Sequence, residues 1–377
     1  MTARDVTNAA KRLAEGERRR YRVDPTLEDG NRADADEVIA LLRSSGYWDA
    51  ALDGALAPVL FEVTQTFHAA YRGASSVFKS VIAREEGELI GHVSSLRAYD
   101  RTWMTQHLAT SPHRHVADLL SLRAGEHLLQ TTNIEFFKIW YQDHKPWPSR
   151  VFGSFAQTVT DANRSDLRGH RHVSMATGTA PSAGNDDIQV RVADDAELGQ
   201  IAGFFAVHEL PLLVRADDLH AARLSLGLLE NSFASAGLSR CRRVLVATRA
   251  GCCLGFALAE LSSVGLNLYE ILSTFRLFVL PESRTSAPAV RAALLRGVAH
   301  LYREAGRATA HGLVPCNEIV DYLQLGLEID HETWMCWTFD RETFQGFRRH
   351  VTRLFERLRR AEFNRRRAAD PAFYSRK

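Results

Sequence analysis

Apolar and polar positions in the second half of the chain follow first a strand pattern and then a helix pattern. Residues 244–248 and 254–261 are apolar runs around the turn Arg249-Ala250-Gly251, which predicts a β-hairpin. The aromatic and branched residues of 267–280 predict a long strand, and Pro281 ends it because proline cannot donate to a sheet ladder. The hairpin and the long strand are therefore expected to form one sheet.

A helical pattern follows this strand. Apolar residues at helical spacing predict a helix that Gly306 closes. The apolar positions on its face are Val290, Leu294, Leu295, Val298, Leu301 and Tyr302. A short strand over 308–316 and a second helix over 318–328 are expected next. The order is thus hairpin, strand, helix, strand, helix.

The first half of the chain repeats this order. Residues 80–96 and 243–261 both read as an apolar strand, a charged turn, a glycine and an apolar strand, with Gly91 and Gly255 equivalent. A strand, a loop and a helix with a Leu-Leu pair follow in each half. The strands expected in the first half are 21–23, 77–83, 88–96, 103–109 and 134–141, and the helices are 4–20, 35–42, 52–71 and 116–129. The similarity predicts two copies of one α/β unit.

The domain boundary is expected in a linker over 176–187, which is rich in Gly, Ala, Ser, Thr and Pro. It separates an N-terminal domain, 1–175, from a C-terminal domain, 188–345. The tail, 346–377, holds eleven Lys/Arg against three acids and has an amphipathic helical pattern. Two interpretations stay open for it: a helix docked on the second domain, or a binding surface for nucleic acid, an anionic membrane or an acidic carrier protein.

Composition narrows the class of protein. The chain is 45% apolar and 24% charged, and its net charge of +2 says little about partners. Nucleic acid is not the expected partner of the whole chain. We expect a cytoplasmic protein, because no apolar run approaches the roughly 18 residues of a membrane span and the N-terminus lacks a secretory pattern. The five cysteines have no metal-ligand spacing, so we expect reduced thiols and no metal.

The element order, together with Tyr322-x-x-x-Gly326-Leu327, resembles the GNAT (GCN5-related N-acetyltransferase) superfamily. The resemblance implies an α/β fold of two tandem GNAT-like domains, each a mixed, mostly antiparallel sheet flanked by helices, plus the C-terminal basic helix. It also implies acetyl-CoA or another acyl-CoA as a substrate and an amine as the acceptor.

The family's pyrophosphate loop reads Gln/Arg-x-x-Gly-x-Gly/Ala, and the second copy matches it incompletely. One register gives Arg284-x-x-Ala287-x-Ala289, and another puts Ala289 and Arg291 at the glycine positions. No glycine is present in either register, and Pro288 removes one donor. The resemblance assigns cofactor contacts to Leu277, Val279, Arg284, Ser286, Ala287 and Ala289. The loop of the first copy, 111–117, also lacks glycine but carries three side chains that can be cationic.

Two residues of the second copy are candidates for catalysis by this resemblance. Glu270 is expected within a strand, where burial would raise the pKa of its carboxyl and suit a general base. Tyr322 matches the family's general acid. Each has a structural alternative: Glu270 pairs with an arginine such as Arg276, and Tyr322 is a half-buried helix aromatic. His311 and His107 are further candidate bases or structural histidines.

The leading hypothesis is an acyltransferase that moves an acyl group from acyl-CoA to a small-molecule or peptide amine by direct attack. The second copy is the expected working site and the first copy is expected to be non-catalytic. Two alternatives stay open: a non-catalytic pair of GNAT-like domains that binds a ligand or acts as a scaffold, and an N-acyl synthase that depends on an acidic acyl carrier protein.

Overall fold

The computed structural model describes residues 26–30, 33–112, 116–179 and 187–369. The helix and strand expected within 4–23, much of the linker and the end of the tail lie outside the described residues.

All described strands join one 12-stranded sheet in the order β1-β2-β3-β4-β5-β12-β6-β11-β10-β9-β8-β7. The strands are β1 Thr26–Asp29, β2 Phe78–Glu85, β3 Glu88–Tyr99, β4 Thr102–Thr110, β5 Phe136–Gln142, β6 Ser165–Ala176, β7 Gln189–Val192, β8 Arg240–Arg249, β9 Cys252–Ser262, β10 Thr274–Val279, β11 Thr309–Pro315 and β12 Glu328–Asp340. Only β4–β5 and β10–β11 are parallel pairs, and every other pair is antiparallel.

The sheet is built from two copies of one unit. In the first copy β1 to β5 follow one another in the sheet, and in the second copy β7 to β11 do so in the opposite direction along it. Each parallel pair is connected through one long helix, α5 Ala117–Thr131 in the first copy and α11 Ala287–Glu304 in the second. The mixed, mostly antiparallel sheets expected from the sequence are confirmed.

The two copies exchange their last strands. β6 comes from the end of the first half but pairs with β11 of the second, whereas β12 comes from the end of the second half and pairs with β5 of the first. β6 and β12 also pair with each other, from Ser165–Phe339 to Ser174–Glu328. The linker at 176–187 stays a predicted boundary, and strand pairing crosses it in both directions.

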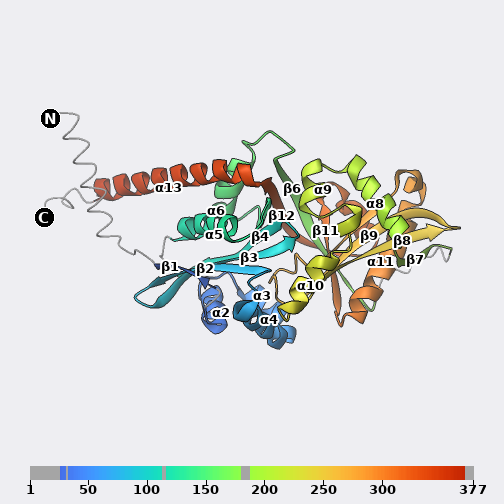
Figure 1. The fold of residues 1–377 in the computed structure, drawn as a ribbon, viewed down its shortest axis with the longest axis horizontal. Helices are drawn as coiled ribbons and strands as arrows, with labels where there is room; N and C mark the ends of the chain where they lie inside the picture. Colours follow the sequence, from blue (N-terminus) through green and yellow to red (C-terminus); the bar gives the residue numbers. More distant parts are fainter. Residues whose placement is uncertain (1–25, 31–32, 113–115, 180–186, 370–377) are drawn as a thin grey trace.

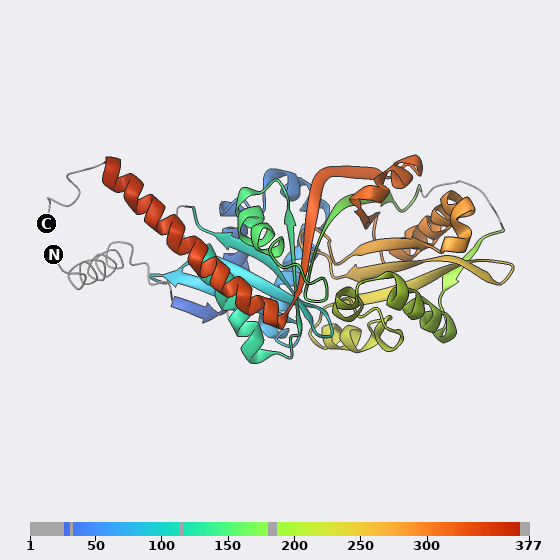
Figure 2. The same cartoon turned by 90° about the horizontal axis from the view of Figure 1, so that it is seen from above.

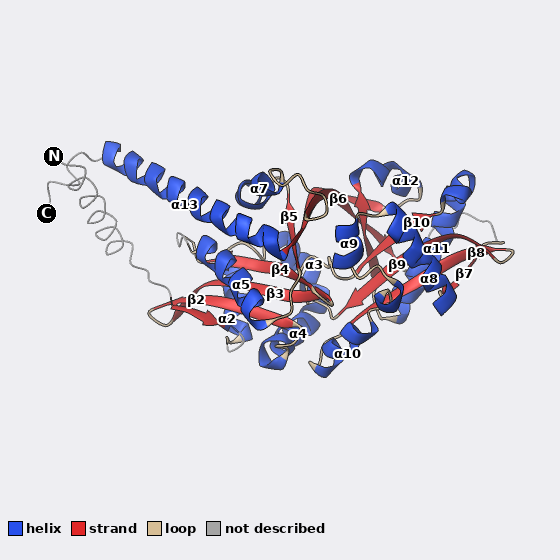
Figure 3. Cartoon of the chain, turned by 45° about the horizontal axis from the view of Figure 1, so that its top comes forward, coloured by secondary structure: helices blue, strands red, loops and turns tan. Residues whose placement is uncertain are grey.

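Helices cover both faces of the sheet (Figures 1 and 3). The helices not yet named are α2 Ala35–Ser44, α3 Ala50–Leu56, α4 Leu60–Gly73, α6 Pro146–Pro148, α7 Ser154–Ala156, α8 Asp195–His208, α9 Pro211–Ala216, α10 Gly227–Ser235, α12 Ile319–Gln324 and α13 Arg341–Ala369. In the first half α2 packs on β3 and β4 on one face, and α5 packs on β2, β3 and β4 on the other. In the second half α11 covers β7 to β11, and α10 packs on β8 on the opposite face.

The basic C-terminal helix α13 packs on the first half, not on the second. It contacts α5, β5 and β12, and Figure 2 shows it crossing the first half and extending beyond it. Phe344 near its start stacks on Phe137 of β5 at 4.8 Å between ring centroids. The expectation that this helix docks on the second domain is therefore wrong. β12 carries the chain into the first half before α13 begins.

The long strand expected over 267–280 is confirmed only from Thr274 onward. Residues 263–273 form a loop, in which the Asn267 side chain accepts hydrogen bonds from the N–H groups of Tyr269 and Ile271. The buried apolar residues of this loop belong to the core of the first half: Leu266, Leu268, Ile271 and Leu272. Their apolar character thus comes from packing between the two copies and not from strand pairing.

Candidate functional site

The strands β10 and β11 diverge in the middle of the second copy. They pair only at Thr274–His311 and Phe275–Gly312. Beyond these pairs β10 continues against β9 and β11 continues against β6. Within the described chain, the edge of β10 that faces β11 therefore has no strand partner after Phe275, and its N–H and C=O groups need another partner.

A loop and a helix start lie at the open end of this divergence. Residues Pro281–Ser286 form a 3-10 turn, and α11 begins at Ala287 without a side-chain cap. The first N–H groups of a helix have no intrahelical partner and attract anions. Arg284 is exposed in this loop, and the Ser286 hydroxyl donates to the Ser283 carbonyl at 3.1 Å.

Gly255 of β9 allows α11 to approach the sheet closely. A Cβ at this position would lie 2.5 Å from the Phe278 carbonyl oxygen and 3.0 Å from Val290 Cγ1. This close approach fixes the start of α11 beside the end of β10. The glycine that appeared in both hairpins of the sequence thus has a packing reason in the second copy.

Tyr322 of α12 reaches the open edge of β10. Its side chain is only 2% exposed and has a backbone hydrogen bond with Leu277. Burial, with a further contribution from Glu318, raises the pKa of the Tyr322 hydroxyl well above its usual value. The hydroxyl is therefore protonated at neutral pH and has a proton to donate.

The remaining residues assigned to the acyl donor border the same region. The Leu277 side chain is buried in the core beneath α11. The side chains of Val279 and Ala289 pack against the same core. Their side chains therefore face the core, and only backbone groups of these residues are left to contact a ligand at the open edge.

Glu270 lies in the loop before β10 and not within a strand, with a φ of 54°. Its Oε2 is 3.9 Å from Arg307 Nη1, and its Oε1 accepts a hydrogen bond from the Gly265 N–H at 3.4 Å. Burial raises the pKa of the Glu270 carboxyl, and Arg307 opposes this shift. The arginine beside it is thus Arg307, since Arg276 lies 3.6 Å from Asp217 instead.

Both candidate histidines are neutral at pH 7; His107 is buried and His311 is half-buried. His311 stacks on His172 of β6 at 5.0 Å, and burial together with His172 and Arg307 lowers its pKa to about 4. His107 has a φ of 53°, and burial lowers its pKa to about 3. Its Nε2 accepts a hydrogen bond from the Leu268 N–H at 3.4 Å, which ties the loop of the second copy to the first.

The corresponding strands of the first copy, β4 and β5, pair over four residues, from Thr102–Phe136 to Thr105–Ile139. Its expected phosphate loop, 111–117, is described at Ser111, Pro112, Val116 and Ala117, and residues 113–115 lie outside the described chain. Where the family places its last helix, residues 146–156 form two three-residue helices separated by one π turn. Pro146 and Pro148 lie in the first of these short helices, and proline disfavours a longer regular helix here.

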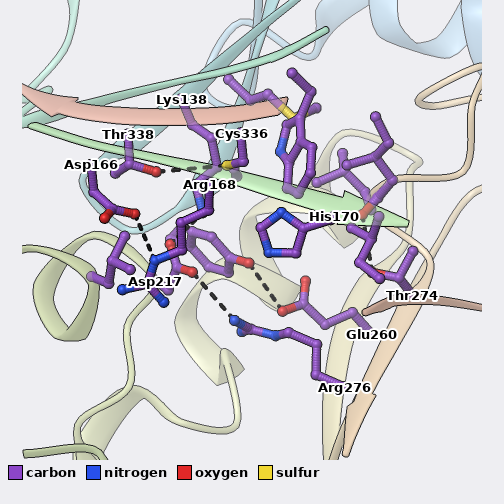
Figure 4. Close-up of a pocket in the computed structure, with 18 of the residues that line it drawn as sticks. Lys138, Asp166, Arg168, His170, Asp217, Glu260, Thr274, Arg276, Cys336 and Thr338 are labelled. Atoms are coloured by element: carbon purple, nitrogen blue, oxygen red, sulfur yellow. Dashed lines mark hydrogen bonds and ion pairs between the residues drawn. The ribbon is translucent and has the colours of Figure 1, made fainter. Parts of the chain in front are cut away.

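A charged cavity of about 70 Å³ lies where the two copies meet (Figure 4). Residues from both halves line it, and the charged ones among them are Lys138, Asp166, Arg168, Glu209, Asp217, Glu260 and Arg276. Neither Glu270 nor Tyr322 lines it, although Ile271, the residue after Glu270, does.

Most charges in this cavity are held in close pairs. Arg168 donates to both carboxylate oxygens of Glu209, at 3.1 and 2.7 Å. Glu260 accepts from Arg240 at 2.7 Å and from Arg242 at 2.8 Å. Burial alone would raise the pKa of Glu260, but the arginines around it lower that pKa to about 2. Glu260 is therefore ionised at neutral pH and is a weak base.

Asp143, His144 and Glu332 are a grouping of possible metal ligands at the surface, with ligand atoms within 4.8 Å of one another. His144 Nδ1 already pairs with Glu332. A surface ion pair accounts for this arrangement.

No family model matches the sequence, and comparison with curated proteins finds no match. Among solved structures, a GCN5-related N-acetyltransferase from Sphaerobacter thermophilus has a TM-score of 0.50 at 12% identity, over 84% of this chain and 95% of that chain. A tandem GNAT protein from the clavulanic acid biosynthesis pathway has a TM-score of 0.47 at 16% identity, over 84% of this chain and 98% of that one. The resemblance drawn from the sequence is thus confirmed for the fold, which is that of a GNAT protein with two copies of the unit.

Proposed function

We propose that the protein is an acyltransferase that moves an acyl group from acyl-CoA to an amine, with its working site in the second copy. The observation that carries this proposal is the divergence of β10 and β11 after Phe275–Gly312, beside the start of α11. An extended, amide-containing donor can pair with the open edge of β10 there, as an added strand would.

The donor's phosphates are assigned to the loop before α11. Arg284 is exposed and cationic, and Ser286 and Ala289 lie at the start of α11, which has no side-chain cap. The Ala287 N–H donates to the Arg284 carbonyl of the preceding 3-10 turn, so a phosphate would have to compete for it. Pro288 provides no N–H, so the phosphate contacts depend more on Arg284 than they would in a glycine loop.

The proposed reaction is direct attack. The amine nitrogen forms a bond to the thioester carbonyl carbon, the carbon–sulfur bond breaks, and the thiolate takes a proton. Glu270 is our proposed acceptor of the ammonium proton, acting through water because its carboxylate lies outside the central cavity. Tyr322 is our proposed donor to the thiolate, supported by its protonated hydroxyl beside Leu277.

Release of free CoA thiol in the presence of acetyl-CoA, longer acyl-CoAs and a panel of small and peptide amines tests this function. We expect transfer with at least one amine, and a rate reduced about 10²–10⁴-fold when the acid is removed in Tyr322→Phe, with little change in donor affinity. The same rate in wild type and Tyr322→Phe would remove Tyr322 from the mechanism. No transfer with any pair would reject the enzyme.

One observation favours the non-catalytic alternative: Tyr322 is 2% exposed and occupies the edge of β10 that the donor would use. In that alternative the tyrosine closes the space, and Tyr322→Ala opens it. Donor binding to Tyr322→Ala but not to wild type would support a closed, non-catalytic fold. Binding of a donor attached to an acidic carrier protein, without binding of acyl-CoA, would support the carrier-dependent synthase.

A further inference from the structure

Arg276 of β10 is a cation in the central cavity without a strong partner. Its guanidinium points into the cavity toward Asp217, with Glu260 beside it (Figure 4). Its Nη2 is buried without a hydrogen-bond partner, and its Nη1 is 3.6 Å from Asp217 Oδ2, beyond hydrogen-bond distance. A buried guanidinium N–H without an acceptor is costly, so the position favours a ligand that supplies one.

The carboxylates nearby are already occupied by other cations. Asp217 Oδ1 is 2.5 Å from Lys138 Nζ, and both side chains are almost fully buried. Glu260 is paired with Arg240 and Arg242. Arg276 therefore differs from the other cations of the cavity, since each of them has a carboxylate within 3 Å.

His170 of β6 lines the same cavity, and its ring has a backbone hydrogen bond with Arg168. Its Nδ1 is buried and has no hydrogen-bond partner. Burial lowers the pKa of His170 to about 4, with Arg276, Lys138 and Arg168 contributing, so the ring is neutral at pH 7. A neutral imidazole can donate one N–H without adding a charge.

Arg276 and His170 together favour a carboxylate as the bound anion. A guanidinium is a planar fork that matches a carboxylate in a bidentate pair. Met104, Trp140, Leu213 and Leu313 form apolar walls of the same cavity, which leaves room for a short carbon chain and not for a large or strongly hydrated anion.

Arg276 joins this cavity to the point where β10 and β11 diverge. It immediately follows Phe275, the last residue of β10 that pairs with β11. Neighbouring side chains on a strand point to opposite faces, so Arg276 faces the cavity while Phe275 and Leu277 face the core under α11. A molecule held by Arg276 therefore lies beside the point at which β10 becomes free.

We propose that the central cavity binds the carboxylate of a small molecule through Arg276 and His170. Resting on the proposed acyltransferase function, this makes the acceptor an amino acid or another short amine that carries a carboxylate. The carboxylate anchors at Arg276, and the amine extends toward the open edge of β10.

Thermal unfolding with acetate, glycine and methylammonium tests this inference in the full chain, with sodium chloride at equal ionic strength as the reference. We expect acetate and glycine to raise Tm and methylammonium to leave it unchanged. Arg276→Gln should abolish the shift, corresponding to an affinity at least tenfold weaker. Arg348→Gln is the matched control, because Arg348 lies on the exposed face of α13 and pairs with Glu126.

Arg276→Lys is the second variant, in case Arg276→Gln fails to fold. It keeps the charge beside Asp217 but lacks the fork, so we expect a weaker shift than in wild type. Equal shifts in wild type and both Arg276 variants, or no shift with either carboxylate, would overturn the inference. Acyl transfer to amines with and without a carboxylate at equal rates would also overturn it while leaving the acyltransferase proposal intact. Carboxylate binding without any acyl transfer would leave the inference about the cavity intact and contradict the acyltransferase proposal.

Discussion

Lys138 of β5 and Asp217, which follows α9, form a buried ion pair that joins the two copies, with Nζ 2.5 Å from Oδ1. Burial alone would lower the pKa of Lys138, but Asp217 raises it above its usual value. Such a pair need not add net stability over apolar residues, whereas removing one partner leaves an uncompensated charge.

Lys138→Met should therefore destabilise the protein. We expect a loss at the low end of roughly 3–5 kcal/mol, because Arg276 supplies a second positive charge 3.6 Å from Asp217. Urea unfolding at pH 7 measures this loss. The double variant Lys138→Met/Asp217→Leu should recover most of it, and a single variant as stable as wild type would show that the pair is not buried as described.

Stability should fall in mild acid because several buried or half-buried histidines are neutral in the folded protein. Burial lowers the pKa of His92, His170 and His311 to about 4 and that of His107 to about 3, against a usual value near 6.5. Above pH 6.5 these rings are neutral in both states. Below it the unfolded chain takes up protons that the folded protein does not, so the free energy of unfolding decreases until the folded pKa is reached.

Each such histidine contributes a slope of about 1.4 kcal/mol per pH unit between pH 6.5 and its folded pKa. Urea unfolding at pH 7.5, 6 and 5 measures the slope. His170→Asn should reduce it, and the matched substitution of the exposed His144 should not. A free energy of unfolding that is constant from pH 7.5 to 5 would contradict this account.

The contact between α5 and α13 depends on Gly125. A Cβ at this position would lie 2.2 Å from Phe344 Cζ, a ring that packs in the core of the first half. Gly125→Ala should therefore cost roughly 1–3 kcal/mol through overpacking, despite the better helix propensity of alanine.

Gly203 of α8 is the matched control, since a Cβ there would have no heavy atom within 4 Å. Gly203→Ala should stabilise by about 0.4–1 kcal/mol. Chemical unfolding of both variants tests the packing of α13. A gain in stability from Gly125→Ala would indicate that α13 does not pack on α5.

The local pattern of apolar residues and turn residues predicts the repeated units. It does not predict how the two units combine. The hairpins, α5 and α11 follow from apolar spacing and from turn residues such as Gly87 and Gly251, which have φ of 88° and 80°. The exchange of β6 and β12 was not predicted, because neither strand was recognised. Pairing between strands more than 130 residues apart leaves no local signal.

The central cavity was missed for a related reason. Its lining comes from strands in both halves that only the exchange brings together. A signal did exist in single charged residues within apolar strands, such as Lys138 in FFKIWY and Glu260 in FALAEL. Such residues are expensive to bury alone, so their presence indicates a partner elsewhere in the fold. Glu270 was a candidate for the same reason, because it is a charged residue within an apolar run. Its partner, Arg307, is at the other end of β10 from the phosphate loop.

The donor site in the second copy is the central claim, and thermal unfolding with acetyl-CoA and longer acyl-CoAs tests it most directly. A donor present at about 100 times its dissociation constant stabilises the folded state by roughly 2.7 kcal/mol, which raises Tm measurably. We predict a rise in Tm for wild type that is lost in Arg284→Gln and kept in the control Arg348→Gln. No rise with any acyl-CoA, or an equal rise in Arg284→Gln, would contradict a donor site at β10 and the start of α11.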